Sequence, residues 1–401
     1  MQQCRKERDC FNDSKQIQIM IRITDKSRCT GCTACVTACP AQCIVMRRDR
    51  QGFDYPVANP DLCLNCGKCD SICPVPKSAE SRDSLAAFAV RVPEYVDQCS
   101  SGGVFPKLAE DVIKADGVVY GAILQDDMTV GHTDVWNSEG LKKMRGSKYV
   151  QSDLYSVFEE IADNLKDGVK VMFTGTPCQI AGLNSYLGKD YENLLTVEVA
   201  CHGVPSPGLW ENYLRAVEKK YGGKVTDVRF RDKSKGWRHY SFVMEIEGKG
   251  KVAVPYMKDP YMALFVQDMI LRPSCYECRF VKGISGADIT LADLWNVREV
   301  APSMNDDKGV SLVIANSEKG LESLCGMDLQ SVDYHTAIKE NGGFVPVKAI
   351  PQRRDEFFQG YGSAKDLPAY MKGFVVRKPL HIVIYRTLRS CLSGLKRRIV
   401  R

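Results

Sequence analysis

The pattern of hydrophobic and polar positions changes near residue 85. From that point, short apolar runs typical of strands alternate with segments in which apolar residues recur at helical spacing. This alternation predicts a mixed sheet covered by helices, in the α/β or α+β class. The expected strands are residues 85–90, 117–124, 131–136, 169–173, 194–200, 225–231, 240–246, 251–254, 287–292 and 310–315. The expected helices are 104–114, 153–165, 207–221 and one that follows a turn at 174–177 and runs through 187.

The same pattern divides the chain into four parts. Residues 1–19 differ from the rest of the chain and are interpreted as a disordered extension. Residues 20–78 form a first unit, which ends in a stiff, polar run suited to a linker. Residues 85–343 carry the alternating pattern and form the main domain. Residues 344–401 are interpreted as a basic tail.

The charge of the tail is one-sided. Nine Lys or Arg and no Asp or Glu lie between Leu367 and Arg401, and apolar residues are interspersed over 380–395. A basic amphipathic helix on a membrane surface has this composition. A solvated helix and a segment that docks a partner protein have it too.

Cysteine is the exceptional residue of this chain. The 401 residues include 18 cysteines, nine of which lie between positions 29 and 73. A disulfide framework requires export, yet the first residues are polar and charged and lack the apolar core of a signal peptide. No run of about eighteen apolar residues indicates a membrane span. We therefore expect a cytoplasmic protein whose clustered cysteines bind metal. The net charge of +6 is too mild to indicate nucleic acid.

Two cysteine runs repeat one pattern, C-x2-C-x2-C-x3-C-P. In two-cluster ferredoxins the first three cysteines of such a run ligate one cubane and the fourth ligates the other. We therefore expect one [4Fe–4S] cluster at Cys29, Cys32, Cys35 and Cys73, and another at Cys63, Cys66, Cys69 and Cys39. Zinc, the alternative, rarely uses three cysteines in register before a C-P step. Cys43 lies outside the pattern and is interpreted as a small buried residue.

Four later cysteines follow predicted strands or form a C-x2-C pair: Cys178, Cys201, Cys275 and Cys278. Ligands gather at the carboxyl ends of strands in open α/β sheets, so these thiols suit one metal centre. Spacing alone leaves three interpretations open, namely a third cluster, a zinc site and plain buried thiols.

Five motifs follow one another in the main domain: SSGGVF from Ser100, GSKYVQ from Gly146, TGTPCQ from Thr174, CHGVPSP from Cys201 and ADITLADLW from Ala287. Together they resemble the beta subunit of coenzyme F-420 hydrogenase/dehydrogenase, over residues 85–343. Many bacterial members of that family carry an N-terminal two-cluster ferredoxin domain. The plant reductase that acts on hydroxymethyl chlorophyll is a relative.

The resemblance implies an FAD beside a third [4Fe–4S] cluster, which the four later cysteines would ligate. It also implies FAD contacts at Ser100, Ser101, Gly102, Gly103, Val104, Lys148, Tyr149, Gln151, Thr174, Gly175, Thr176, Pro177 and Asp293. The chemistry agrees, because glycines at a helix start let N–H groups face a pyrophosphate, and Lys148 could neutralise phosphate charge. Amides near Thr174 could stabilise a reduced flavin. The alternatives are an ordinary capping turn at 100–103 and a helix-capping role for Asp293.

These features predict an oxidoreductase that relays electrons. A donor such as ferredoxin or a redox subunit would reduce the first two clusters. Electrons would then pass through the third cluster to FAD and, as a hydride equivalent, to a small organic acceptor. His202 is the candidate proton donor, since histidine titrates near neutrality, and a structural role is its alternative. A non-catalytic electron-transfer subunit and a zinc-stabilised binding module are the rival hypotheses.

Overall fold

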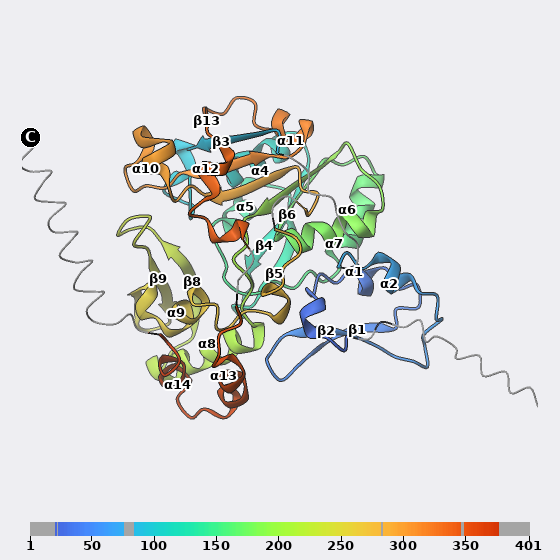
Figure 1. The fold of residues 1–401 in the computed structure, drawn as a ribbon, viewed down its shortest axis with the longest axis vertical. Coiled ribbons are helices and arrows are strands. Elements are labelled where there is room, and N and C mark those ends of the chain that lie inside the picture. Colours follow the sequence, from blue (N-terminus) through green and yellow to red (C-terminus); the bar gives the residue numbers. More distant parts are fainter. Residues whose placement is uncertain (1–20, 22, 76–83, 282–283, 346–348, 377–401) are drawn as a thin grey trace, which may run out of the picture.

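The computed structural model describes residues 21, 23–75, 84–281, 284–345 and 349–376 (Figure 1). The extension expected at 1–19 and the stretch 380–395 of the expected tail lie outside these residues. Among the helices within the described ranges, none is both long and apolar enough to span a membrane.

A mixed sheet of eight strands lies at the centre of the main domain (Figure 1). In spatial order the strands are β13 (Leu329–Ser331), β3 (Ala86–Val90), β12 (Ser311–Ala315), β11 (Ile289–Asp293), β7 (Leu194–Val199), β6 (Val171–Gly175), β4 (Val118–Leu124) and β5 (Val130–Val135). The strands β11, β7, β6 and β4 pair in parallel, and antiparallel pairs flank them on both sides. The mixed sheet confirms the fold class that the alternating apolar runs predicted.

Helices pack on both faces of this sheet. The longer ones are α4 (Val104–Lys114), α5 (Ser138–Met144), α6 (Val157–Lys166) and α7 (Pro177–Leu187), and the shorter ones are α3 (Pro93–Val96), α10 (Val297–Val300), α11 (Glu318–Glu322) and α12 (Tyr334–Ile338). Val119 of β4 and Met172 of β6 face α4 and α5, whereas Tyr120 and Phe173 face α6 and α7. Successive residues of a strand point to opposite faces, so the same strands supply both cores.

Helix α6 begins later than apolar spacing predicted. The backbone N–H of Tyr155 donates to Asp153 Oδ1 at 2.9 Å, and Tyr155 itself has a φ of +42°. This turn uses the residues that the apolar spacing assigned to the first helical turn, because an Asp side chain offers the backbone an alternative hydrogen bond. The helix therefore starts at Val157 rather than at residue 153.

A second, antiparallel sheet contains β8 (Val225–Asp232), β9 (Ser241–Ile246) and β10 (Gly250–Pro255). Two helices pack against it, α8 (Pro207–Tyr221) and α9 (Pro260–Val266). Trp210 of α8 and Tyr261 of α9 are fully buried there, with ring centroids 5.0 Å apart. These two side chains belong to the core that joins the second sheet to its helices.

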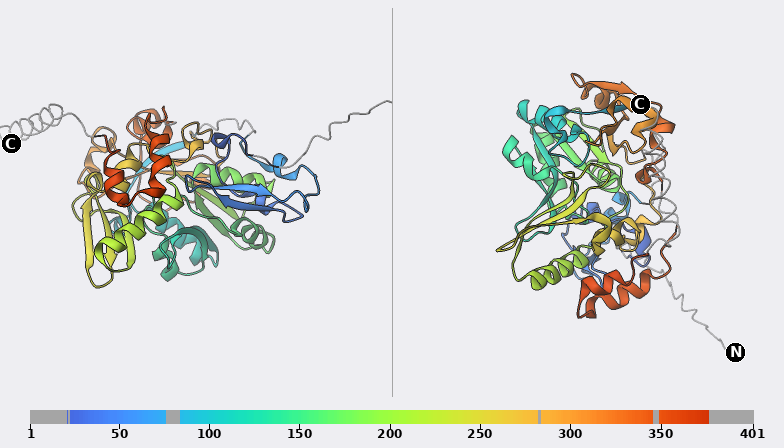
Figure 2. Two further views of the ribbon diagram at one scale, coloured as in Figure 1. Left: turned by 90° about the horizontal axis from the view of Figure 1, so that it is seen from below. Right: turned by 90° about the vertical axis from the view of Figure 1, so that its left-hand side faces the viewer.

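The packed chain continues beyond residue 343, where the sequence pattern ended the main domain. Helices α13 (Arg354–Gly360) and α14 (Leu367–Lys372) follow, and α14 lies beside α8 and α9 (Figure 2). Phe357 and Met371 are buried in the core around Trp210. Helices of about two turns give too few apolar positions for a period to emerge, so the sequence did not reveal them.

Residues 21 and 23–75 form the ferredoxin-like domain, with the hairpin β1 (Ile44–Arg48) and β2 (Asp54–Ala58) and the short helices α1 (Ala34–Thr37) and α2 (Lys68–Ile72) (Figure 1). Helix α1 contacts α6 and α7. Phe53 and Tyr55 enter the core around Trp210. The ferredoxin-like domain thus shares its packing with the main domain instead of folding apart from it.

Candidate cluster and flavin sites

The first expected cysteine set is gathered in the structure. The thiols of Cys32 and Cys35 each interact electrostatically with those of Cys29 and Cys73. The chain between the first cysteines turns tightly, and Gly31 in this turn has a φ of +73°. Burial raises the pKa of Cys32 to about 12. A thiolate at this place therefore needs the positive charge that iron would supply.

The second expected set lines a single cavity, which is bordered by Cys39, Cys63, Cys66 and Cys69. The backbone N–H of Asn65 donates to Cys63 Sγ at 3.4 Å. Cys43 is buried, and it borders the same cavity with its Sγ 3.5 Å from Cys39 Sγ. Cys39 of the first run thus borders the cavity of the second run, and Cys73 of the second run lies within electrostatic reach of Cys32 and Cys35 of the first.

The four later cysteines form a third set. Cys178 lies in the first turn of α7, Cys201 follows β7, and Cys275 and Cys278 lie on the loop after α9. The thiol of Cys201 interacts electrostatically with the other three. Burial raises the pKa of Cys178 to about 11 and that of Cys275 to about 12. Three separate parts of the main domain therefore bring these four thiols within electrostatic reach of one another.

Backbone N–H groups point at the sulfurs of the third set. The N–H of Val204 donates to Cys275 Sγ at 3.5 Å. Backbone hydrogen bonds also link Gly203 to Cys201 and Phe280 to Cys278. Hydrogen bonds of this kind orient ligands and tune reduction potentials in iron–sulfur sites. The donors around these thiols therefore fit a cluster.

The first and third sets are neighbours. The thiols of Cys32 and Cys178 interact electrostatically. Gly182, one turn further along α7, lies against the same cysteine, because a Cβ added there would come within 2.9 Å of Cys32 Cβ. Cys73 and Cys278 share one small apolar core with Cys178. Helix α7 thus carries a cysteine of the third set and contacts a cysteine of the first.

Two of the expected flavin segments adjoin one another. The backbone N–H of Ser147 donates to Ser100 Oγ at 2.8 Å, which joins the turn 100–103 to the segment after α5. Gly103 precedes α4 with a φ of +88°, a conformation that favours glycine. Val104 is the first residue of α4 and is buried. The free N–H groups of the first helical turn therefore start beside both segments.

Gly102 fixes this turn to the sheet. Its N–H donates to Ser311 Oγ at 3.0 Å, and a Cβ added to it would collide with Val90 O. Only glycine can approach the backbone of β3 so closely. Gly102 is therefore needed for the close contact with β3, and Gly103 is needed for the turn that starts α4.

Lysines occupy the surroundings of the turn 100–103. Lys148 Nζ donates to the carbonyls of residues 143–146 and so stabilises the end of α5, a role that its sequence position did not reveal. Lys233 Nζ donates to Ser101 O at 3.0 Å. Burial lowers the pKa of Lys148 to about 7 and that of Lys233 to about 8. An anion at this place would favour the charged form of both lysines.

Asp293 lies at the end of β11 in a largely buried ion pair with Arg231. The indole N–H of Trp237 donates to the same carboxylate at 3.1 Å. Tyr149 is near this pair, with its ring centroid 4.5 Å from that of Phe265. The carboxylate of Asp293 is therefore engaged by a cation and an indole rather than by the start of a helix.

Residues 174–177 form a rigid turn from the end of β6 into the first residue of α7. Thr176 and Gln179 form a reciprocal capping box at the start of that helix. Nε2 of His132 lies 2.9 Å from Thr174 O, within hydrogen-bond distance. The flavin contacts expected here thus lie between the sheet and the third cysteine set.

Two other expected residues have different surroundings. Gln151 contacts the ferredoxin-like domain, where its Nε2 donates to Thr30 O at 3.0 Å. His202 follows Cys201 in the chain, and its Nε2 lies 2.6 Å from Asp268 Oδ1. Sequence spacing did not identify Asp268, because it follows a different helix, α9.

Buried cations were also missed from the sequence. Arg231 pairs with Asp293, and Arg272 donates to Cys29 O at 2.8 Å. Both contacts join parts of the chain that lie far apart in sequence, so no local pattern marks them. The one local signal is Gly31 in the first cysteine run, which leaves room for the Arg272 guanidinium.

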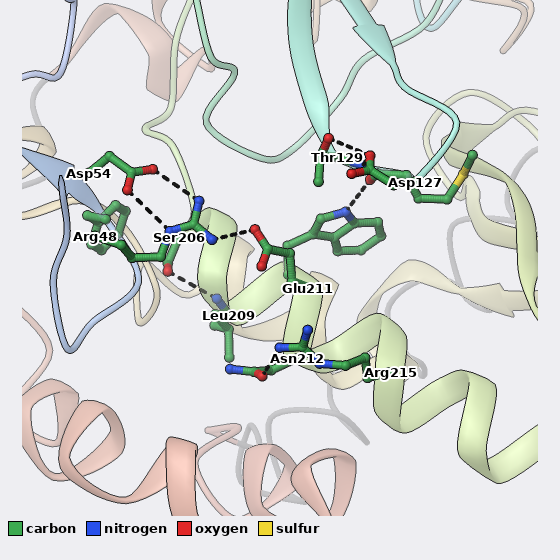
Figure 3. Close-up of polar contacts among 12 residues, drawn as sticks. Arg48, Asp54, Asp127, Thr129, Ser206, Leu209, Glu211, Asn212 and Arg215 are labelled. Carbon is green, nitrogen blue, oxygen red and sulfur yellow. Dashed lines mark hydrogen bonds and ion pairs between the residues drawn. The ribbon is translucent and has the colours of Figure 1, made fainter. Parts of the chain in front are cut away.

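A cleft lies between the hairpin of the ferredoxin-like domain and α8, and Arg48 bridges it (Figure 3). Arg48 pairs with Asp54 in its own hairpin, at 3.1 Å, and with Glu211 on α8. The Leu209 N–H donates to Ser206 Oγ at 3.2 Å, which starts α8 at the same place. These contacts hold the hairpin against the main domain.

Comparison with known proteins agrees with both halves of this architecture. Residues 168–337 match the model for the C terminus of the coenzyme F420 hydrogenase/dehydrogenase beta subunit. Residues 28–76 match the 4Fe-4S dicluster domain. The two matched ranges contain all three cysteine sets.

Curated relatives cover shorter stretches. An uncharacterized protein of Methanocaldococcus jannaschii is 24% identical over 206 residues, which cover 43% of this chain and 56% of that protein. The 7Fe ferredoxin of Hydrogenibacillus schlegelii is 38% identical over 53 residues, which cover 13% of this chain and 62% of that protein. The chain thus spans less than two thirds of the length of either relative.

A solved chain of the F420-reducing [NiFe] hydrogenase complex from Methanosarcina barkeri is also similar. It has a TM-score of 0.41 and 18% identity, and the match covers 73% of this chain and 92% of that chain. The family model and the dicluster model together account for the later motifs and for the cysteine sets. The chain therefore combines a region that matches the C terminus of the coenzyme F420 hydrogenase/dehydrogenase beta subunit with a 4Fe-4S dicluster domain, and the two matches together support a redox role in electron transfer.

Proposed function

We propose that the chain is a flavin-dependent oxidoreductase in which three [4Fe–4S] clusters lead to an FAD. The observation that carries this proposal is the third set of four thiols, which adjoins the first set through Cys32 and Cys178. A ligand set beyond the dicluster domain would extend the route for electrons into the main domain. FAD, when bound, joins one-electron carriers to two-electron chemistry on an organic acceptor.

The order of the three sets supports a relay. Cys66, in the second set, is exposed. Cys69 of the second set interacts with Cys35 of the first, and Cys178 of the third set interacts with Cys32 of the first. Electrons would therefore enter at the exposed set and pass inward, one at a time, to the main domain.

The surface around the second set supports a protein as electron donor. Leu62 and Leu64 are 57% and 68% exposed and flank Cys63 in the sequence. Exposed apolar side chains beside a redox centre suit contact with a partner protein. A ferredoxin or a redox subunit would reduce the chain at this place.

Two features support FAD in the main domain. The turn 100–103 and the segment around Ser147 meet at the start of α4, where unpaired N–H groups favour a phosphate. Lys148 and Lys233 lose their charge readily unless an anion is near. The pyrophosphate of FAD would satisfy both features.

Metal and flavin analysis of the anaerobically purified chain tests the proposal. We expect about twelve iron atoms and about one FAD per chain, since each [4Fe–4S] cluster holds four irons. Cys178→Ala should reduce the iron to about eight atoms, whereas Cys325→Ala, at an exposed cysteine outside the three sets, should leave it unchanged. About eight iron atoms in the unmodified chain, or zinc in place of the missing iron, would contradict the third cluster.

The flavin site has its own variant. Gly103→Ala places a side chain at a φ of +88° and 2.8 Å from Tyr95 Cβ, which distorts the start of α4. The flavin-to-iron ratio should fall in this variant. Gly362→Ala, where no atom lies within 4 Å, is the matched control and should keep both cofactors. Equal flavin contents in the two variants would contradict a flavin at this helix.

A further inference from the structure

Arg272 is a fully buried cation at the boundary between the two domains. Its backbone belongs to the loop that carries two cysteines of the third set. Its N–H donates to Val204 O at 3.0 Å, and its carbonyl accepts from the Cys275 N–H at 2.9 Å. Its side chain leaves that loop and enters the ferredoxin-like domain.

The guanidinium contacts the chain around the first set. Nε donates to Cys29 O at 2.8 Å, and Nη2 donates to Asp54 O at 2.9 Å. Nη2 also lies 3.7 Å from Cys29 Sγ, within the range of a hydrogen bond to sulfur. The guanidinium lies over the ring of Tyr55, with Cζ 4.2 Å from the ring centroid. One side chain thus holds both the sulfur and the backbone of a candidate cluster ligand.

Gln151 and Gly31 complete this arrangement. Gln151 Oε1 accepts from Arg272 Nη1 at 2.9 Å, while its Nε2 donates to Thr30 O. A Cβ added to Gly31 would come within 2.7 Å of Gln151 Nε2 and 3.1 Å of Arg272 Cζ. Position 31 therefore requires glycine for two reasons: a side chain would collide with Gln151 and crowd the guanidinium, and the backbone has a φ of +73°, which favours glycine. The contact is built into the sequence of the first cysteine run.

Within the described part of the chain, no carboxylate forms an ion pair with Arg272. Removing an arginine from water without an opposite charge carries a large desolvation penalty. The thiol of Cys29, whose Sγ lies 3.7 Å from Nη2, can become anionic beside it. The guanidinium also interacts electrostatically with the thiols of Cys178 and Cys275, and among the described residues it donates no hydrogen bond to either of these two sulfurs. A [4Fe–4S] cluster held by four thiolates is itself an anion and would balance the guanidinium.

We propose that Arg272 is a positioning residue that raises the reduction potential of the cluster at Cys29, Cys32, Cys35 and Cys73 and holds this cluster against the third set. Reduction adds one negative charge to the cluster, and a cation beside Cys29 stabilises that state. Arg272 is also fixed to Cys275 through its backbone. Arg272 therefore affects two quantities: the reduction potential of the first cluster, and the distance between the first and third cysteine sets. The acceptor cluster in this inference rests on the proposed function, whereas the dicluster domain is that of the matched family model.

Redox titration of the anaerobically purified full chain, followed by electron paramagnetic resonance, tests this assignment. Arg272→Gln should lower the reduction potential of the first cluster by about 59 mV. For a one-electron step, this shift makes the reduced-to-oxidised ratio of the cluster fall about tenfold at a fixed applied potential. Arg272→Lys should keep a potential near that of the unmodified chain. It should also slow the transfer of electrons to the main domain in stopped-flow reduction, because lysine lacks the fork that spans Cys29 O and Asp54 O.

Arg354 provides a matched control. It is also buried and crosses the same boundary, donating to Gln51 Oε1 at 2.9 Å and to Leu271 O at 2.7 Å. Among the residues that the structure describes, none of its hydrogen bonds goes to a sulfur of the first set. Arg354→Gln should therefore loosen the boundary to a similar extent and leave the potential of the first cluster unchanged.

Each outcome decides the assignment. An unchanged potential in Arg272→Gln with full iron content would overturn it, as would an equal shift in Arg354→Gln. If Arg272→Gln loses iron, Arg272→Lys decides: retention of iron at the original potential supports the role of the charge, and loss of iron contradicts it. An unmodified chain with about eight iron atoms would remove the third cluster of the proposed function. The potential shift in Arg272→Gln would still be measurable in that chain.

Discussion

His132 gives the fold a dependence on pH that can be calculated. The side chain is buried on β5 beside Phe173, at 5.6 Å between ring centroids, and Thr174 O, at 2.9 Å from Nε2. The neutral ring donates from Nε2 to this carbonyl, while the buried Nδ1 has no hydrogen-bond partner among the described residues. Protonation would place a second N–H and a charge in this environment. Burial therefore lowers the pKa of His132 from 6.5 to about 4.

The magnitude follows from this difference. His132 binds its proton more weakly in the folded state than in the unfolded state. The free energy of unfolding therefore falls as the pH falls from 6.5 toward 4, because the unfolded chain takes up the proton first. The full effect is about 3 kcal/mol, since each pKa unit corresponds to about 1.4 kcal/mol. About 2 kcal/mol of this stability should already be lost at pH 5, relative to pH 7.5. His132→Gln, whose amide can still donate to Thr174 O, should lose this part of the pH dependence.

Urea denaturation followed by circular dichroism at pH 5 and pH 7.5 measures the difference. The free energy of unfolding of the unmodified chain should fall by about 2 kcal/mol more than that of His132→Gln. His335→Gln, at an exposed histidine on α12, is the control and should follow the unmodified chain. An equal pH dependence in His132→Gln and the unmodified chain would refute this role of His132.

Three further predictions concern packing and docking. In Gly182→Ala the new Cβ would stand 2.9 Å from Cys32 Cβ, so the free energy of unfolding should fall by about 1–3 kcal/mol and electron transfer into the main domain should slow. Urea midpoints measure the first effect, and stopped-flow reduction measures the second. Leu64→Glu should slow reduction by a ferredoxin and leave the iron content unchanged, as a steady-state assay at limiting donor would show. Arg231→Gln should destabilise the main domain by about 3–5 kcal/mol, because it leaves the largely buried carboxylate of Asp293 without its cation, and the urea midpoint would reveal this.

The sequence predicted most of the main-domain elements because their signals are local. Helices α4 and α8 have the bounds that apolar spacing predicted. In the parallel strand β6, the residues from Val171 to Phe173 are buried on both faces and form a continuous apolar run. In β7, buried Leu and Val residues gave the signal although the buried Thr196 and Glu198 interrupt the run. The cysteine pattern of the first unit was equally accessible, since three thiols at a spacing of three and a following proline lie within one short segment.

Other features depend on contacts that no local pattern encodes. The helices α13 and α14 are too short for a period to emerge, so their packing against the core around Trp210 was not predicted. The hydrogen bonds of Lys148 to the end of α5 were not predicted either, because they depend on Nζ folding back onto the preceding turn. The expected phosphate contact of Lys148 stays a prediction.

The separation between the first and third cysteine sets depends on two contacts that reach the same run from different directions. Helix α7 carries Cys178 and presents Gly182 to Cys32. Arg272, on the loop after α9, reaches Cys29 through its guanidinium. Because Cys29 and Cys32 flank one tight turn, a rotation of the ferredoxin-like domain about either contact would break the other. The distance between the two sets should therefore be fixed by α7 and Arg272, and breaking the Arg48 bridge to α8 should leave that distance unchanged.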